Sequence, residues 1–186
     1  VEISVAPQAN RLAVYLWTAD RQLLGRSNLH SRGETRSAIH TRLEDQALED
    51  LDAGENDRIE FKEFVRPRDK KETELTRTVI AFANTHGGRL YLGVDDNCTP
   101  QGEDALDVFD KNRSNDRQTE VQRRMETLIR GRIKPAPRFS ISWLHLLGAP
   151  VLVVEVEEGS SKPYATHDSN DIHIRKGATN RRPDPH

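Results

Sequence analysis

The sequence predicts an α+β fold, in which a mixed β-sheet is packed by helices, for most of this 186-residue chain. From Ile59 onward, segments with the pattern of strands alternate with segments that have the apolar spacing of amphipathic helices, in the order β-α-β-α-β-β-β. Turn residues separate these segments, and no internal repeat interrupts them. Such an order favours helices that pack on a mixed sheet.

Residues 1–54 are predicted to form an N-terminal extension, a β-hairpin followed by a helix. Residues 11–17 have the composition of a strand, and Leu23-Leu24 begins its expected hairpin partner. Residues 34–51 carry apolar side chains near helical spacing, and Gly54 suits the left-handed end of that helix. The extension contains no motif that indicates a chemistry.

The predicted domain covers residues 55–182, and residues 183–186 form a tail. Residues 59–65 alternate apolar and charged side chains, which is typical of a half-buried strand. A helix is expected over 71–84 and a buried strand over 89–94. Gly87-Gly88 breaks the chain between them, because glycine permits both a reversal and close packing of helix on sheet.

The second half of the domain begins with a polar segment, 98–115, that we expect to be a loop. Val121, Met125, Leu128 and Ile129 predict a second core helix by their spacing. Strands are expected over 139–145 and 151–156, with a turn at 148–150, and a last short strand over 172–175 precedes a basic tail.

Composition excludes several classes of protein. Cys98 is the single cysteine, so no internal disulfide or cysteine-rich zinc site can form, which fits a reducing compartment. No stretch approaches the roughly 20 apolar residues of a spanning helix. We therefore expect a cytoplasmic protein with no membrane partner.

The net charge of −2 conceals a separation of charge along the chain. Residues 44–60 contain eight acidic residues and one basic residue, whereas residues 111–138 contain nine basic and three acidic residues. The tail from His173 adds four more bases against one acid. Two basic runs in a short chain indicate a face for phosphates, and solvated helix surfaces are the alternative.

Four blocks of sequence resemble the signature of one family. These blocks are Glu60-Phe61-Lys62 and residues 81–88, 92–96 and 174–181. Together, in this order, they resemble the Schlafen AlbA-like domain, which implies a domain that binds nucleic acid.

The same resemblance implies three metal-binding, catalytic carboxylates at Glu55, Glu60 and Asp96. Hard cations such as Mg²⁺ or Mn²⁺ take oxygen ligands, offset phosphate charge and activate water. The alternative is that Glu55 and Asp96 are ordinary turn acids and that Glu60 pairs with a lysine or an arginine.

The residues expected to hold nucleic acid are basic or hydrogen-bonding. Those of the last block surround Gly177, and charge-assisted bonds from them could hold phosphate oxygens. A frayed basic tail, and a Lys62 that pairs with an acid, are the alternatives. The full expected set is Lys62, Arg130, Arg132, Lys134, Arg175, Lys176, Thr179, Asn180 and Arg181.

The leading hypothesis is a divalent-metal-dependent endoribonuclease that acts on structured RNA such as tRNA. A non-catalytic DNA-binding regulatory module, and an assembly or nucleotide-binding domain, are the rivals. The preference for RNA over DNA and the expected homodimer both come from the resemblance.

Overall fold

The computed structural model describes residues 11–17, 23–30, 38–64, 70–102, 105–106 and 117–183. The chain divides into two compact units, Val1–Gln46 and Ala47–His186. In the first unit, β1 (Arg11–Trp17) pairs antiparallel with β2 (Leu23–His30). The expected hairpin is therefore present.

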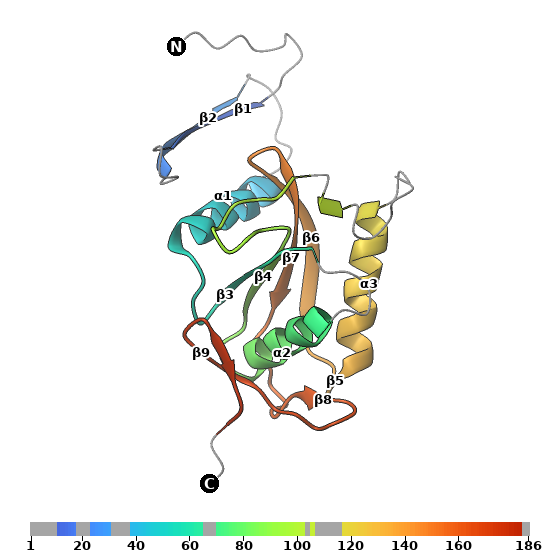
Figure 1. Cartoon of the computed structure of the whole chain (residues 1–186). Coiled ribbons are helices and arrows are strands. Elements are labelled where there is room, and N and C mark those ends of the chain that lie inside the picture. Colours follow the sequence, from blue (N-terminus) through green and yellow to red (C-terminus); the bar gives the residue numbers. More distant parts are fainter. Residues whose placement is uncertain are drawn as a thin grey trace. The chain divides into compact units, whose positions relative to one another are not determined.

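The second unit is built on a four-stranded sheet of order β3-β4-β7-β6. β3 (Ile59–Lys62) runs parallel to β4 (Gly88–Leu92), and the other neighbours, β7 (Ala149–Val156) and β6 (Phe139–Leu146), are antiparallel. The sheet is mixed, and its helices pack against it (Figure 1), so the predicted fold class is confirmed.

Helix α2 (Lys70–Asn84) connects the two parallel strands, as a parallel pair requires. Its apolar stripe, Leu75, Val79 and Phe82, is buried in the core. Gly87 follows with φ +69°, and a Cβ there would lie 2.6 Å from the carbonyl oxygen of Val156. The predicted glycine break is therefore required by both conformation and space.

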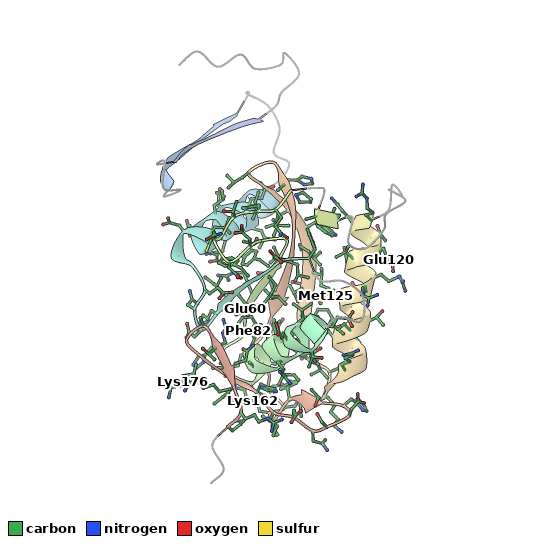
Figure 2. The ribbon with its side chains drawn as sticks, viewed as in Figure 1. Glu60, Phe82, Glu120, Met125, Lys162 and Lys176 are labelled. Carbon is green, nitrogen blue, oxygen red and sulfur yellow. The ribbon has the colours of Figure 1, made fainter. Side chains whose placement is uncertain are left out.

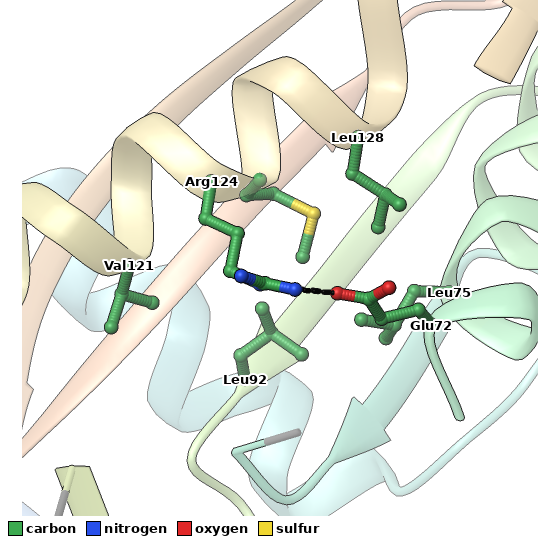
Figure 3. Close-up of a pocket in the computed structure, with 7 residues that line it drawn as sticks. Glu72, Leu75, Leu92, Val121, Arg124 and Leu128 are labelled. Carbon is green, nitrogen blue, oxygen red and sulfur yellow. Dashed lines mark hydrogen bonds and ion pairs between the residues drawn. The ribbon is translucent and has the colours of Figure 1, made fainter. Parts of the chain in front are cut away.

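Helix α3 (Arg117–Arg132) packs Val121, Met125 and Ile129 into the same core. Arg124 reaches across to Glu72 of α2 beside the apolar side chains of Val121, Leu92 and Leu75, as Figure 3 shows. The pocket around this ion pair holds only about 20 Å³, which is about the size of one water molecule. It has no room for an organic ligand.

The opposite face of the sheet is covered by the end of α1 (Ala38–Ala53). Side chains of a strand alternate between faces, so Tyr91 points away from the core that contains Leu90 and Leu92. Asp50 of α1 accepts hydrogen bonds from the Tyr91 hydroxyl at 2.6 Å and from Arg89 Nε at 2.5 Å. Burial, together with the bond to Asp50, raises the pKa of Tyr91.

The division of the chain into two units falls between Gln46 and Ala47, inside α1, whereas the sequence predicted a boundary after Gly54. Ala47, Leu48 and Leu51 are buried in the second unit. Gly54, with φ +72°, ends the helix as predicted.

Three short strands, β5, β8 and β10, were not predicted. β5 (Ile133–Lys134) pairs with β8 (Ala165–Thr166), and β10 (Thr179–Arg181) pairs with β9 (Ile174–Lys176), the expected last strand. The expected basic tail is thus the second strand of a hairpin. Strands of two or three residues carry too little periodicity to be found in a sequence.

No helix in the described segments has the length and apolar character needed to cross a membrane.

We predict that Asp50→Ala lowers the free energy of unfolding by about 3 kcal/mol, because Tyr91 and Arg89 lose their buried acceptor. Asp52→Ala, which changes an exposed acid on the same helix, should cost no more than about 0.5 kcal/mol. Urea unfolding of both variants measures the difference, and equal midpoints would contradict it.

Candidate nucleic-acid interface

Glu60 on β3 is a buried carboxylate, 4% exposed, with a cation at each oxygen. Lys62 Nζ lies 2.8 Å from its Oε1, and Arg175 Nη2 lies 2.5 Å from its Oε2. A buried charge requires such partners, because removal from water is costly. The structure therefore agrees with the alternative stated above, in which Glu60 pairs with a lysine or an arginine; here it pairs with both.

The Arg175 guanidinium, 0% exposed, makes four hydrogen bonds within the protein. Its Nε and Nη2 donate to the carbonyl oxygen of Asn56 at 3.0 and 2.9 Å, and Nη2 also donates to that of Ile59 at 3.1 Å. The guanidinium carbon lies 5.3 Å from the centre of the Phe82 ring. The expectation that Arg175 contacts phosphate is thus corrected, since the side chain lies inside the domain (Figure 2 shows Glu60 and Phe82 there).

Asn180 is also placed differently from the prediction. Its Oδ1 accepts from Arg175 Nη1 at 3.0 Å, and its Nδ2 donates to Thr78 Oγ1 at 2.8 Å. The backbone N–H of Arg175 donates to Thr85 Oγ1 at 2.9 Å. These bonds fasten the β9–β10 hairpin to α2, and they engage the amide that was expected to meet phosphate.

Asn84 completes the fastening from the end of α2. Its Nδ2 donates to the carbonyl oxygens of Tyr164 and His173, and its Oδ1 accepts from the Tyr164 N–H. The Asn84 amide therefore has a structural role, because it joins the end of α2 to the segments that lead into the hairpin.

The outer side of the hairpin carries the side chains that remain available. Lys176, Thr179 and Arg181 are exposed, and Gly177 takes φ +58° at the turn between them. Figure 2 shows Lys176 at the periphery of the domain. All three side chains are therefore accessible from outside the domain.

A second basic group lies at the end of α3 and in β5. Arg130 and Arg132 are exposed, and Lys134 is half-buried. Lys134 Nζ donates to the carbonyl oxygen of His167 at 3.1 Å.

The turn over residues 166–171 links the two basic groups. Lys134 bonds to it at His167, and Arg182 Nη2 bonds to it at Asp171 Oδ1, at 2.7 Å. Helix α2 packs beside β8, β9 and β10. The turn therefore contacts both Lys134 of the α3 group and Arg182, the residue that follows the hairpin.

Sequence reasoning left Arg77 and Arg182 out of the site. Arg77 is half-buried on α2. The pKa of His173 is lowered, mainly because the His173 side chain is buried and secondly because of the positive charge of Arg77. Helix α2, which carries Arg77, packs beside β9 of the hairpin. Helical spacing could show only that Arg77 lies outside the apolar stripe of α2. Nothing in the sequence indicates that Arg182 bonds to Asp171.

The two remaining predicted metal ligands, Glu55 and Asp96, are exposed acids near Lys62. Glu55 Oε1 accepts from the Phe61 N–H at 2.9 Å and lies 3.8 Å from Lys62 Nζ. Burial lowers the pKa of Lys62, but the bond to Glu60 and the charges of Glu60, Glu55 and Asp96 outweigh it, so the pKa is raised. All three acids therefore act on one ammonium group.

These residues, as arranged, do not fit a resident divalent cation. Among the residues that the structure describes, no group of three or more His, Cys, Asp or Glu side chains is placed to hold a metal ion. Glu60 has no oxygen available for a metal ion, because both of its carboxylate oxygens already face cations of the protein.

A larger hollow of about 460 Å³ lies at the ends of β4, β6 and β7, away from these acids. Its charged lining carries both signs: Arg58, His86, Arg89, Glu155, Glu157 and Glu158. A lining of mixed charge does not favour a polyanion.

The pattern of the family described as Schlafen, AlbA_2 matches residues 55–184. A search of curated proteins gave no match.

Two solved structures are similar to the chain. The N-terminal domain of a putative ATP-dependent DNA helicase RecG-related protein from Nitrosomonas europaea is 26% identical, with 77% of this chain and 90% of that one covered and a TM-score of 0.50. The DIP2311 protein from Corynebacterium diphtheriae is 21% identical, with a TM-score of 0.48. That match covers 78% of this chain but only 30% of the other.

We predict that Arg175→Met lowers the free energy of unfolding by about 3 kcal/mol, because Glu60 stays buried and loses one of its cations. Lys176→Met makes a comparable change at the next residue, which is exposed, and should cost no more than about 0.5 kcal/mol. Chemical unfolding compares the two variants. A similar, small loss in both would show that the buried pair contributes little.

Proposed function

The chain belongs to the Schlafen AlbA_2 family, and from that premise we propose that its domain binds the phosphate backbone of nucleic acid. The binding surface consists of the exposed bases of the β9–β10 hairpin and those at the end of α3. One observation carries the proposal. The hairpin is fastened from inside by Arg175 and Asn180, so that Lys176 and Arg181 remain exposed on a fixed support.

The comparisons support the class of partner. The family and the similarity to the N-terminal domain of a RecG-related protein indicate a nucleic-acid-related domain. That relative is named as a putative DNA helicase, whereas the resemblance of the sequence blocks points to RNA. RNA in preference to DNA is therefore the finer proposal, and the binding test below includes both.

Charge supports the same function. Phosphate contacts from lysine and arginine supply most of the affinity of such proteins and do not depend on base sequence. A hairpin that is already ordered loses little conformational entropy on binding. The net charge of −2 does not oppose this function, because acids and bases are separated along the chain and Lys176, Arg181, Arg130 and Arg132 are exposed.

We expect Lys176→Ala/Arg181→Ala to weaken binding of tRNA and of single-stranded DNA by roughly tenfold. The dependence of log K on log salt should flatten by about one unit for each phosphate that the variant no longer neutralises. Fluorescence anisotropy between about 50 and 200 mM salt measures both quantities.

The matched control is Arg123→Ala, which also removes an exposed arginine. Its guanidinium pairs with Glu120 on α3, and Figure 2 shows Glu120 and Lys176 on opposite sides of the view. Its affinity and salt slope should equal those of the wild type. Salt-insensitive binding, or an equal loss in both variants, would contradict the proposed surface. Absence of binding to any nucleic acid would favour the assembly or nucleotide-binding alternative.

Two finer hypotheses come from the family resemblance alone. A homodimer rests on the family resemblance, and sedimentation at micromolar concentration tests it. Metal-dependent cleavage of structured RNA requires Glu60 to exchange its two cations for Mg²⁺ or Mn²⁺ beside Glu55 and Asp96. Labelled tRNA in Mn²⁺, with wild type, Glu60→Ala and Asp96→Ala, tests it: cutting that is lost in both variants would establish the nuclease, and intact RNA would leave a binding module.

A further inference from the structure

We propose that the Lys62 ammonium is the resident cation of the acidic site formed by Glu55, Glu60 and Asp96, and that it excludes a divalent metal from that site. This inference goes beyond nucleic-acid binding and does not depend on it.

The backbone builds this arrangement. Lys62 follows Glu60 by two residues on β3, so their side chains leave the strand on the same face. Glu55 comes from the turn before the strand, where the Phe61 N–H holds its Oε1 at 2.9 Å. The ammonium therefore lies against both acids, 2.8 Å from Glu60 Oε1 and 3.8 Å from Glu55 Oε1.

The other oxygen of Glu60 pairs with Arg175 by charge alone and accepts no hydrogen bond from it. The Arg175 guanidinium is buried and is fixed by the carbonyl oxygens of Asn56 and Ile59 and by Asn180. Arg175 cannot leave without unfastening the hairpin. Lys62 is therefore the replaceable cation of the pair, since its side chain is 24% exposed and ends near solvent.

The charges of these five side chains decide what else the site can accept. Three carboxylates face two cations, so one negative charge remains. A divalent ion would turn this remainder into an excess of one positive charge, with an ammonium group close to the metal. In a partly buried site that repulsion is severe, because unit charges 4 Å apart interact by about 4 kcal/mol at an effective dielectric constant of about 20.

Removal of Lys62 reverses the balance. In Lys62→Met the remaining charges sum to two negative, which one divalent ion neutralises. Glu60 and Glu55 then offer carboxylate oxygens to the position that the ammonium group has left, and the exposed side of the site admits the waters that Mg²⁺ and Mn²⁺ retain. The variant should acquire a metal site that the wild-type protein lacks.

The test is a titration of the full chain with Mn²⁺ alone, without nucleic acid, followed by calorimetry and by the electron paramagnetic resonance of free Mn²⁺. The wild type should show no saturable binding up to about 1 mM, the weak end of protein sites for hard divalent ions. Lys62→Met should bind one Mn²⁺ at least roughly tenfold more tightly than the wild type. Lys62→Met/Glu60→Gln should lose that binding.

The matched control is Lys176→Met, which makes the same substitution at an exposed lysine of the hairpin and should create no Mn²⁺ site. Saturable binding by the wild type that Glu60→Gln abolishes would overturn the proposal. A folded Lys62→Met variant that gains nothing would overturn it too.

If Lys62→Met fails to fold, the comparison of wild type with Glu60→Gln still decides, because the proposal requires the wild type to lack a Glu60-dependent Mn²⁺ site. Failure here leaves the anisotropy results on Lys176 and Arg181 untouched, so the two proposals can be judged separately.

Discussion

The ion pair between Glu60 and Arg175 is the interaction on which the arrangement of this domain depends. It joins the edge strand β3 to the C-terminal hairpin, two segments that are far apart in the chain. The same guanidinium bonds to Asn56, Ile59 and Asn180 and lies on Phe82 of α2. One side chain therefore connects the sheet, the central helix and the hairpin.

A buried pair of this kind contributes less net stability than apolar packing would, but loss of one partner is costly. Here it also divides the basic residues by role. Arg175 is buried and bonded within the domain, whereas its neighbour Lys176 is exposed on the other side of β9. The domain can thus expose basic side chains on a short hairpin whose backbone is fixed from within.

Long periodic segments made the central fold predictable. The stripe of Leu75, Val79 and Phe82, and the run before Gly93, predicted α2 and β4 almost to their ends. The hairpin partner β10 could not be predicted, because its three residues are polar and its attachment to α2 depends on Asn180 and Thr78, which lie far apart in sequence.

The site was predictable as a set of residues and not as a set of roles. Glu55, Glu60 and Asp96 all lie near Lys62, and Lys176, Thr179 and Arg181 are exposed as expected. A sequence cannot show, however, that Asn56 and Ile59 present carbonyl oxygens to Arg175, so a buried arginine and an exposed one look alike. The resemblance named the acids, and the positions of two cations determine what these acids can hold.

The most direct test of this account is a double-mutant cycle on the buried pair. Unfolding free energies of wild type, Glu60→Gln, Arg175→Met and the double variant give the coupling energy between the two side chains. We predict a coupling of about 2 kcal/mol, at the strong end of pairs in direct contact. Additive losses, within about 0.5 kcal/mol, would show that Glu60 and Arg175 stabilise the domain independently and would contradict the account.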